Sequence, residues 1–427
     1  MNASAAAINA ECVISGTAIT DGGILPDSLV AIAGGRILYC GPRGNFDDRV
    51  PPGANRIDLP PNAAILPGLV DLHCHGAAGG DFPSANEESS RAAVSFLHAN
   101  GTTTLLASVV TASRNDLLDA IRSLRPLARE GLIAGIHAEG PFLSHARCGA
   151  QDPRWLREPD LELLQDLVRE ADGWLRTMTY APELPGASAL VDMLAGNGVI
   201  PSLGHTDADS RTAAASLEQA GRAISTAALH ASGARPTVTH LFNGMPALHH
   251  RKPGPVAACL RLARTGGIAV ELIADGVHLD PETVRMVFEL VGAENVVLVT
   301  DSMAAAGLPD GEYDLGPSVV SVTQAVATLK TSGSLAGGTA TLLDVVRHTI
   351  AAGLDPAAAV ASASSVPAKL LGLDAEIGSL RQGMRADIVM VDQDFKLLSV
   401  FRKGAQLDSP ARPDGRLAAP RRLFRDA

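Results

Sequence analysis

Eight short apolar runs, separated by helix-like segments, constrain the fold of this chain more than any other feature. The runs lie between about residues 64 and 305 and read AAILPGLVDLHCH, TTTLLASVV, GLIAGIHAE, WLRTMTYAPE, VIPSLGH, TVTHLF, GIAVELIAD and NVVLVTDS. Segments such as ANEESSRAAVSFLHAN and DLLDAIRSLRPLARE separate them. Strands that alternate with helices indicate βαβ units and a parallel sheet. Eight such units favour closure into a (β/α)8 barrel.

The two ends of the chain share a different, strand-rich pattern. Residues 11–59 contain CVISGTAIT and SLVAIAGGRILYCG, and GMRADIVMVDQDFKLLSVFRKG stands near the other end. Short alternating runs broken by glycine and proline are typical of strands. We therefore expect an α/β protein with a TIM-like barrel over residues 61–372. A small β-sandwich domain is expected beside it, formed by residues 1–60 and 373–427, whose last residues form a solvated tail.

Composition excludes several classes of protein. Hydrophobic residues make up 46% of the 427 and charged residues 19%, which favours a large core over disorder. A formal net charge of −11 argues against nucleic-acid binding, although one local basic group would suffice for a small anionic substrate. No apolar run approaches the roughly 18 to 20 residues of a membrane span. The opening MNASAAAINAEC does not resemble a secretion signal.

The cysteines point to a reducing compartment. Five are present, an odd number, widely scattered and without a CxxC pair. This pattern fits neither a disulfide framework nor a zinc knuckle. We therefore expect a soluble, cytoplasmic protein that binds neither nucleic acid nor membranes.

Six of the eight apolar runs end in a potential metal ligand or acid. These residues are His73 and His75, Glu139, His205, His240, Asp275 and Asp301. Catalytic groups of parallel barrels lie at the C-terminal ends of the strands. Residues i and i+2 share a face of a strand, so His73 and His75 can point together into the barrel mouth while Cys74 points away.

Each of these residues alone has an ordinary structural interpretation, such as a hydrogen-bonded histidine or a helix cap. Potential ligands at six strand ends, all at one level of a barrel, favour a metal site instead. Imidazole and carboxylate ligands suit zinc or iron, and manganese or cobalt accept overlapping sets. We expect one or two divalent metal ions per chain.

Seven motifs resemble, in order, the signature series of the N-acetylglucosamine-6-phosphate deacetylases, a family of the amidohydrolase superfamily. They are PGLVDLHCHG, HAEGPFLS, LGHTDA, THLFNGM, ADGVHLDP, LVTDSM and GSLAGG. The resemblance covers about residues 60–375, and HAEGPFLS and THLFNGM are its specific parts. It implies metal-dependent hydrolysis of the N-acetyl group of N-acetylglucosamine 6-phosphate, giving glucosamine 6-phosphate and acetate. The implied setting is amino-sugar catabolism and cell-wall recycling.

The resemblance also implies roles for residues of the metal centre. Glu139, His205 and His240 match the family's metal ligands, and Asp301 matches its catalytic carboxylate. His73 and His75 match a pair that binds a second metal in some members. A bound metal lowers the pKa of water towards about 7 and polarises a carbonyl. Asp301 can then take a proton as base and return it to the leaving nitrogen as acid.

Further matches concern the substrate. His278 matches a substrate-contacting histidine, and Asn243 and Gly244 match positions that meet the sugar phosphate. Arg251 matches an arginine that reaches the phosphate bound by a neighbouring subunit, which implies a homodimer. The remaining expected substrate contacts are Leu335, within the glycine-rich GSLAGG, and Gln151.

Two of these positions depart from the family pattern. Gln151 stands where many relatives have a histidine that contacts the substrate, and a glutamine cannot carry a charge. Gly244 stands where alanine is common, which is a milder change if the backbone makes the contact.

Other functions remain open at this point. The chain could be an N-acetylgalactosamine-6-phosphate deacetylase, because sequence spacing does not encode the geometry of one epimeric hydroxyl. A cyclic-amide hydrolase is disfavoured, since many use a lysine at the end of the fourth strand, where this chain reads TMTYAPE. A catalytically silent barrel that serves as a binding module is the third alternative.

Overall fold

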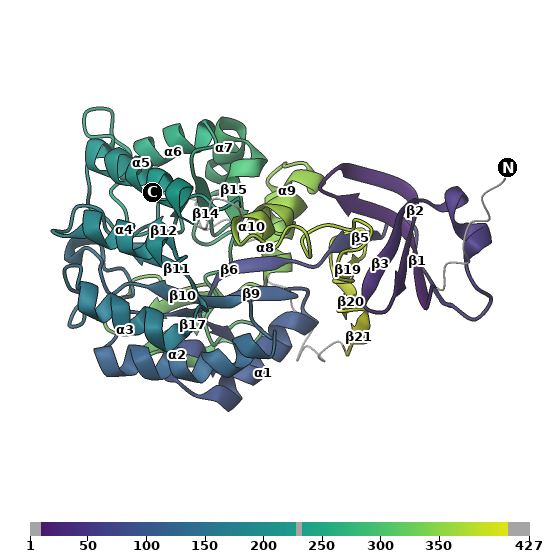
Figure 1. Ribbon diagram of the computed structural model, residues 1–427, viewed down its shortest axis with the longest axis horizontal. Helices are drawn as coiled ribbons and strands as arrows, with labels where there is room; N and C mark the ends of the chain where they lie inside the picture. The colour runs from purple at the N-terminus through teal and green to yellow at the C-terminus, as the bar shows by residue number, and fades with distance from the viewer. Residues whose placement is uncertain (1–9, 228–232, 409–427) are drawn as a thin grey trace.

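The computed structural model describes residues 10–227 and 233–408. A larger lobe, in which helices surround a parallel sheet, lies beside a smaller lobe of β strands (Figure 1). The purple N-terminal strands and the yellow C-terminal strands meet in the smaller lobe. Within the described ranges, no helix has the length and apolar character needed to cross a membrane.

Eight parallel strands form the barrel in chain order, as the alternating pattern predicts. They are β6 (Val70–Cys74), β9 (Thr104–Val109), β10 (Gly135–Glu139), β11 (Leu175–Tyr180), β12 (Ile200–Leu203), β13 (Thr237–Val238), β14 (Ala269–Leu272) and β15 (Val296–Leu298). The two ends of this sheet meet through backbone hydrogen bonds. The N–H of Asp301 donates to the carbonyl of His73 at 2.9 Å, and the N–H of His75 donates to that of Ser302 at 2.7 Å. The (β/α)8 prediction is confirmed. Closure of the barrel brings the end of its last strand against the end of its first strand.

Amphipathic helices cover the outside of the barrel, each with one buried face. They are α1 (Glu87–Ala99), α2 (Arg114–Arg129), α3 (Leu161–Ala171), α4 (Ala187–Gly196), α5 (Ser210–Thr226), α6 (Gly254–Arg264), α7 (Pro281–Val291) and α8 (Leu342–Ala351). Several begin after a side chain that accepts a backbone N–H of the first turn, as Ser113 and Asp209 do. Such N-caps satisfy donors that lack a partner within the helix.

Two short helices lie between the barrel and the smaller lobe, α9 (Pro356–Ser362) and α10 (Ser365–Leu370). Ala368 and Leu370 of α10 pack in one apolar cluster with inward-facing Val70, Leu106 and Val297 of the barrel strands. Val70 and Val297 stand near the beginnings of their strands. This packing fills one end of the barrel and leaves the C-terminal strand ends for a site.

The smaller lobe is built from both chain ends, as predicted, and its strands form one mixed sheet. Its strands are β1 (Cys12–Thr20), β2 (Gly23–Ala33), β3 (Arg36–Pro42), β4 (Asn55–Asp58), β5 (Ala64–Pro67), β19 (Ile388–Val391), β20 (Leu397–Arg402) and β21 (Ala405–Leu407). The N-terminal β5 pairs antiparallel with the C-terminal β19. This pairing joins the two halves of the lobe.

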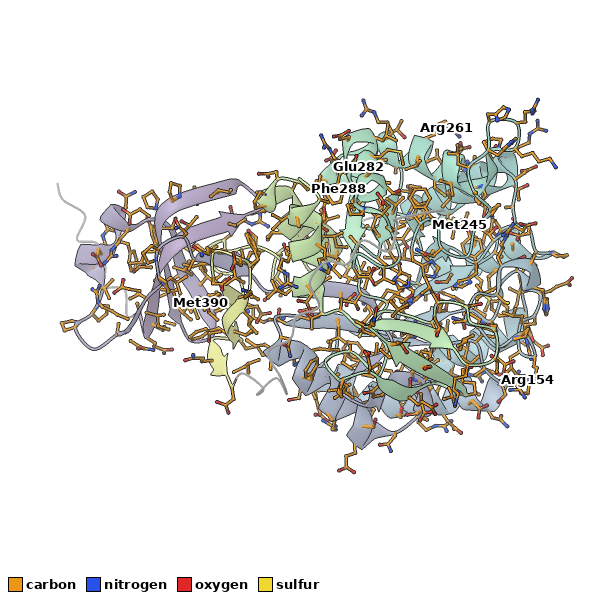
Figure 2. The ribbon with its side chains drawn as sticks, turned by 180° about the vertical axis from the view of Figure 1, so that it is seen from behind. Arg154, Met245, Arg261, Glu282, Phe288 and Met390 are labelled. Carbon is orange, nitrogen blue, oxygen red and sulfur yellow. The ribbon has the colours of Figure 1, made fainter. Side chains whose placement is uncertain are left out.

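Both faces of β19 are buried, and they face different cores. Ile388 and Met390 join the apolar core of the smaller lobe, whereas Val389 and Val391 join the main barrel core. Met390 lies within the smaller lobe in Figure 2. Because successive side chains of a strand point to opposite faces, a strand between two cores is apolar at every position. The run IVMV therefore packs the two lobes together.

The first apolar run is divided between two sheets, which the sequence pattern did not predict. Residues Ala64–Pro67 form β5 of the smaller lobe, and Val70–Cys74 form β6 of the barrel. The chain changes sheets at Pro67 and Gly68. A Cβ at Gly68 would lie 2.1 Å from Oγ1 of Thr103, so only glycine fits there.

A three-stranded antiparallel sheet follows the last barrel strand and was also not predicted. It contains β16 (Gly311–Leu315), β17 (Ser318–Thr323) and β18 (Val326–Leu329). Its signal was the alternation in SVVSVT. The turn between β16 and β17 packs on the barrel: a buried Asp81 carboxylate accepts the N–H of Gly316 at 3.1 Å. Leu315 of this sheet lines the pocket described below.

Candidate metal centre and active site

The structure brings all six predicted residues of the metal centre together at the C-terminal strand ends. Two groups form: the first contains His73, His75, Glu139 and Asp301, and the second contains Glu139, His205 and His240. In each group, one ligand atom per residue lies within 4.8 Å of the others. All six residues are buried. They come from the ends of β6, β10, β12, β13 and β15, as barrel closure requires.

Glu139 belongs to both groups because its two oxygens face opposite ways. Its Oε1 lies 2.9 Å from Nε2 of both His205 and His240. Its Oε2 lies 3.2 Å from Nε2 of His75 and 3.7 Å from that of His73. A carboxylate in this position can be shared between two cations. The sequence motif HAEGP gave the residue but not this bridging geometry.

Hydrogen bonds on the outer side of the rings set which nitrogen faces the cluster. Nδ1 of His75 lies 3.2 Å from the carbonyl of Ser108, and Nδ1 of His205 lies 2.8 Å from that of Arg147. A carbonyl oxygen only accepts, so each Nδ1 carries a proton, and Nε2 is the nitrogen whose lone pair a metal would take. Such partners fix ring orientation in metal sites.

The inner contacts of the cluster fit a divalent metal. Nε2 of His73 lies 3.1 Å from Nε2 of His75, and the same distance separates Nε2 of His205 from that of His240. Ligand atoms about 2.1 Å from a tetrahedral zinc ion are roughly 3.4 Å apart. Lone pairs at such distances repel one another unless positive charge lies between them. Two imidazoles with a carboxylate are the donor set that zinc and iron prefer.

The buried groups of the cluster shift one another's pKa. Burial opposes ionisation of Glu139, but His73 and the hydrogen bonds of His205 and His240 hold its pKa well below the usual range. Burial opposes charge on His75, but Asp301 and Glu139 raise its pKa to about 9. At Asp301 burial is outweighed by His73 and His75, which lower the pKa to about 2. Opposed shifts of this kind are typical of functional sites.

Three of these residues have left-handed backbone conformations: φ is 45° at His205, 29° at His240 and 47° at Asp301. Each follows the end of its strand by two or three residues. A residue other than glycine held there costs on the order of 1–3 kcal/mol, and such strain concentrates at functional sites. The turned backbone aims each side chain across the barrel mouth.

Asp275 does not belong to either group of possible metal ligands, and its carboxylate contacts His278 instead. Its Oδ2 lies 2.8 Å from Nδ1 of His278, and its Oδ1 accepts the backbone N–H groups of Val277 and His278. Burial opposes charge on His278, but Asp275 outweighs it and raises the pKa of the ring. The carboxylate therefore orients His278. The sequence indicated both residues but not their pairing.

A pocket of about 260 Å³ opens above the cluster. Most of the expected substrate-contacting residues line it: Gln151, Asn243, Gly244, His278 and Leu335. His75, Glu139, His205, His240 and Asp301 form its floor. Arg251 does not line the pocket; it is exposed, on a turn closed by a bridge between His249 and Lys252. The described pocket lining includes no arginine or lysine.

Several buried residues that support the ligands were missed in the sequence. His137 contacts Oγ of Ser108 and Oγ1 of Thr179, and its ring centroid lies 4.5 Å from that of His73. Glu271 contacts Nδ1 of His73 at 3.3 Å. The signals were present: His137 stands two positions before Glu139, and Glu271 is a single acid in an apolar strand.

The structure gives a specific geometry to the two positions that depart from the family pattern. Gln151 is buried, and its amide contacts Glu139 at 2.6 Å. Gly244 has φ of 61°, and a Cβ there would lie 2.9 Å from Nδ1 of His205. In this structure, the glycine lets a turn approach a proposed ligand.

Comparisons with known proteins agree with this geometry. The model of the Amidohydrolase family matches residues 64–407. The N-acetylglucosamine-6-phosphate deacetylase of Bacillus subtilis (strain 168) is 33% identical over 397 residues, which cover 90% of this chain and 94% of the relative. The N-acetylgalactosamine-6-phosphate deacetylase of Escherichia coli O157:H7 is 32% identical over 391 residues, covering 90% and 96%.

A solved structure is also similar over nearly the whole chain. It is a mutant of the N-acetyl-D-glucosamine-6-phosphate deacetylase from Mycobacterium smegmatis in complex with N-acetyl-D-glucosamine-6-phosphate. It has a TM-score of 0.84 and 36% identity, and the match covers 93% of this chain and 100% of that chain. By the family match, the relatives and the fold, this chain belongs to the amidohydrolase family.

Proposed function

We propose that the protein is a metal-dependent deacetylase of N-acetylglucosamine 6-phosphate, which releases glucosamine 6-phosphate and acetate. The observation that carries the proposal is one carboxylate, Glu139, shared by two histidine pairs beside Asp301 on the floor of a pocket. Relatives with this activity cover nearly the whole chain. We propose that it acts in amino-sugar catabolism and cell-wall recycling.

Hydrolysis of an N-acetyl group needs an activated water, a polarised carbonyl and a proton for the leaving amine. A bound divalent metal supplies the first two by lowering the pKa of water and drawing electron density from the carbonyl. Asp301, ionised at neutral pH because its pKa is about 2, takes the proton from water. It then returns that proton to the nitrogen as the C–N bond breaks. His278, held by Asp275, faces the same pocket and orients the substrate.

We assign the metal ligands as His73, His75, Glu139, His205 and His240, with room for two ions. Zinc or iron suits the mixture of imidazole and carboxylate, and manganese or cobalt can replace them. Elemental analysis after purification and after loading with each metal tests this. Two ions per chain are expected. A measured content of one ion per chain would remove His73 and His75 from the ligand set. A chain that binds no metal under any loading condition would refute the site.

The reaction is tested by release of primary amine and acetate from N-acetylglucosamine 6-phosphate. We expect turnover that a chelator abolishes and that added metal restores. A metal-loaded, folded chain without turnover would refute the assignment. Such a result would favour the alternative that the chain is a catalytically silent barrel that serves as a binding module.

N-acetylgalactosamine 6-phosphate is the second candidate substrate, because a deacetylase named for it is 32% identical over 90% of this chain. The two sugars differ at one hydroxyl. The ratio of kcat/KM for the two phosphates decides between them, and we expect the glucosamine derivative to be preferred. The reverse preference would reassign the substrate and leave the metal chemistry unchanged.

We further propose a homodimer in which Arg251 binds the phosphate in the partner's pocket. The described lining of one chain's pocket has no arginine or lysine, so a cation for the phosphate must come from elsewhere. Arg251 is exposed on a turn and can be offered to a second chain. The guanidinium group binds phosphate with two parallel hydrogen bonds.

Arg251→Ala should therefore weaken turnover of the phosphorylated sugar and hardly change that of N-acetylglucosamine. Loss of a hydrogen bond to a charged group costs roughly 1.5 to 3 kcal/mol, or about 10- to 150-fold in kcat/KM. Arg261→Ala, an exposed arginine on α6 (Figure 2), is the matched control.

Mixing Arg251→Ala chains with Asp301→Asn chains tests the exchange between subunits. A mixed dimer regains one complete site only if the arginine acts across the interface. A fully active monomer would refute the proposal.

A further inference from the structure

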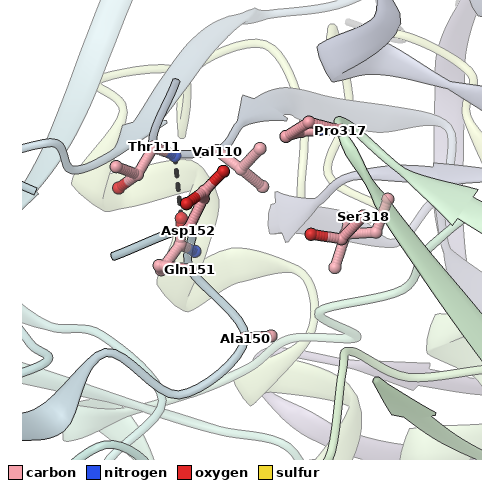
Figure 3. A pocket seen from close by; sticks show the side chains of 8 residues that line it. Val110, Thr111, Ala150, Gln151, Asp152, Pro317 and Ser318 are labelled. Carbon is pink, nitrogen blue, oxygen red and sulfur yellow. Dashed lines mark hydrogen bonds between the residues drawn. The ribbon is translucent and has the colours of Figure 1, made fainter. Parts of the chain in front are cut away.

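Gln151 is a buried loop residue at the edge of the pocket, and its side chain contacts Thr111, just after β9, and Glu139, at the end of β10. It follows the short helix His145–Arg147, and its backbone N–H donates to the carbonyl of Cys148 at 2.9 Å. Only 6% of the surface area of the residue is exposed. Figure 3 shows it near Thr111 and Asp152, with Pro317 and Ser318 on the other side of the pocket.

The orientation of the Gln151 amide follows from its two partners. Oε1 accepts the backbone N–H of Thr111 at 2.7 Å, the dashed line in Figure 3. Nε2 donates to Oε2 of Glu139 at 2.6 Å. A backbone N–H can only donate and an ionised carboxylate can only accept, so the reversed amide would lose both hydrogen bonds. Both polar ends of the side chain are committed to the protein.

The hydrogen bond from Gln151 falls on one particular oxygen of Glu139. Oε1 of Glu139 faces His205 and His240, whereas Oε2 faces His75 and His73. Gln151 therefore holds the oxygen that serves the second pair. Thr111, its anchor, also donates its hydroxyl to the backbone carbonyl of Glu139 at 3.2 Å. The carboxylate is fixed at its backbone and at one oxygen from the same strand end.

We propose that Gln151 is a positioning residue for Glu139, which turns Oε2 towards His73 and His75 and thereby builds that half of the metal centre. The proposal rests on the proposed metal-dependent function. It replaces the expectation that Gln151 contacts the substrate directly. An amide suits this task because it accepts from Thr111 and donates to Glu139 at once and adds no charge beside the cations.

Two substitutions test whether the hydrogen bonds of Gln151 or only the volume of its side chain matter. Gln151→Glu keeps an oxygen for Thr111 but places a second carboxylate against Glu139. Gln151→Met keeps the volume and removes both hydrogen bonds. Gln219→Met is the matched control, because Gln219 is a half-buried glutamine on α5 whose described side-chain hydrogen bonds go only to Ser188 and Asp192.

The readout is zinc binding to the metal-free full-length chain, measured by equilibrium dialysis over graded zinc concentrations. Loss of a partner to a metal-ligating group typically costs about 10- to 100-fold in metal affinity. We expect such a loss at one of two zinc sites in both variants, with the other site changed less than about threefold. The kcat of the zinc-loaded variants should fall while KM stays within about threefold. Gln219→Met should bind both ions as the unmodified chain does.

Three results would overturn the proposal: two unaltered zinc affinities with a raised KM, an equal loss at both sites, or uptake of one zinc ion by the unmodified chain. Should either variant fail to fold by circular dichroism, Gln151→Asn supplies the test. It keeps both polar groups but shortens their reach, and it should weaken the same single site. Dialysis needs no substrate, so absence of deacetylation in the unmodified chain would refute the proposed function without deciding the role of Gln151.

Discussion

Replacing Asp301 by asparagine should separate proton transfer from metal binding. The side chain keeps its size and one oxygen, but an amide cannot take up a proton at neutral pH. The second ligand group, Glu139 with His205 and His240, does not include Asp301. A metal ion bound by this group should therefore remain in the variant. The change therefore tests the proposed acid–base role with little disturbance of the site around it.

The expected magnitude follows from the position of the carboxylate. Its Oδ1 lies 3.2 Å from Nε2 of His75 and 3.3 Å from that of His73, on the pocket floor, and its pKa of about 2 keeps it ionised. General acid–base catalysis contributes about 10²- to 10⁴-fold. At about 1.36 kcal/mol for each factor of ten, the barrier should rise by roughly 2.7 to 5.4 kcal/mol.

The assay combines kcat/KM for amine release with elemental analysis of the same samples. Asp119→Asn, a carboxylate exposed on α2 and paired with Arg122, is the matched control and should keep full activity. A rate for Asp301→Asn within about threefold of the unmodified chain would refute the proton-transfer role. Loss of all metal together with activity would instead make Asp301 chiefly a ligand.

Three further predictions concern stability and the supporting residues. His75 has a pKa of about 9 in the folded chain against about 6.5 unfolded, so its protonated form stabilises the metal-free fold fully below pH 6.5 and progressively less as pH rises through 9. The melting temperature of metal-free protein should fall across that range more than that of zinc-loaded protein, and equal slopes would contradict this. Asp275→Asn should lower kcat about 10-fold or more with metal content intact: if the amide oxygen keeps the backbone N–H groups of Val277 and His278, the NH2 group faces Nδ1 of His278 and cannot accept its N–H. Unchanged activity would remove the pair from the reaction. Gly244→Ala should weaken zinc binding, since its Cβ would lie 2.9 Å from His205 in a backbone conformation unfavourable for alanine, and unaltered zinc affinity would show that the turn adjusts freely.

The fold was largely readable from the sequence because local patterns specify it. Eight apolar runs with helices between them predict a barrel, and a barrel places strand ends such as His205 and Asp301 at one rim. The break at Pro67 and Gly68 could not be read in the same way. It depends on Thr103, a residue distant in sequence that leaves no space for a Cβ.

The ligands of the site were also readable, but their partners were not. A histidine or acid at a strand end is visible as a residue type, whereas the hydrogen bond between Gln151 and Glu139 arises only after two loops have packed. The pairing of Asp275 with His278 is local, three residues apart, and could have been found from a helix-like spacing. The domain limits, the assembly and the cytoplasmic location stay predictions.

The position of β19 between β5 and β20 has a consequence for how the chain is made. Ile388–Val391 pair with Ala64–Pro67, so the two halves of the smaller lobe can join only after residue 391 has been synthesised. Until then Ile65 and Leu66 lack the strand that covers them, and the unpaired edge of β5 is open to other chains. The barrel strands are therefore all made before the smaller lobe can close, and a ribosome that stalls before residue 388 would leave the edge of β5 uncovered.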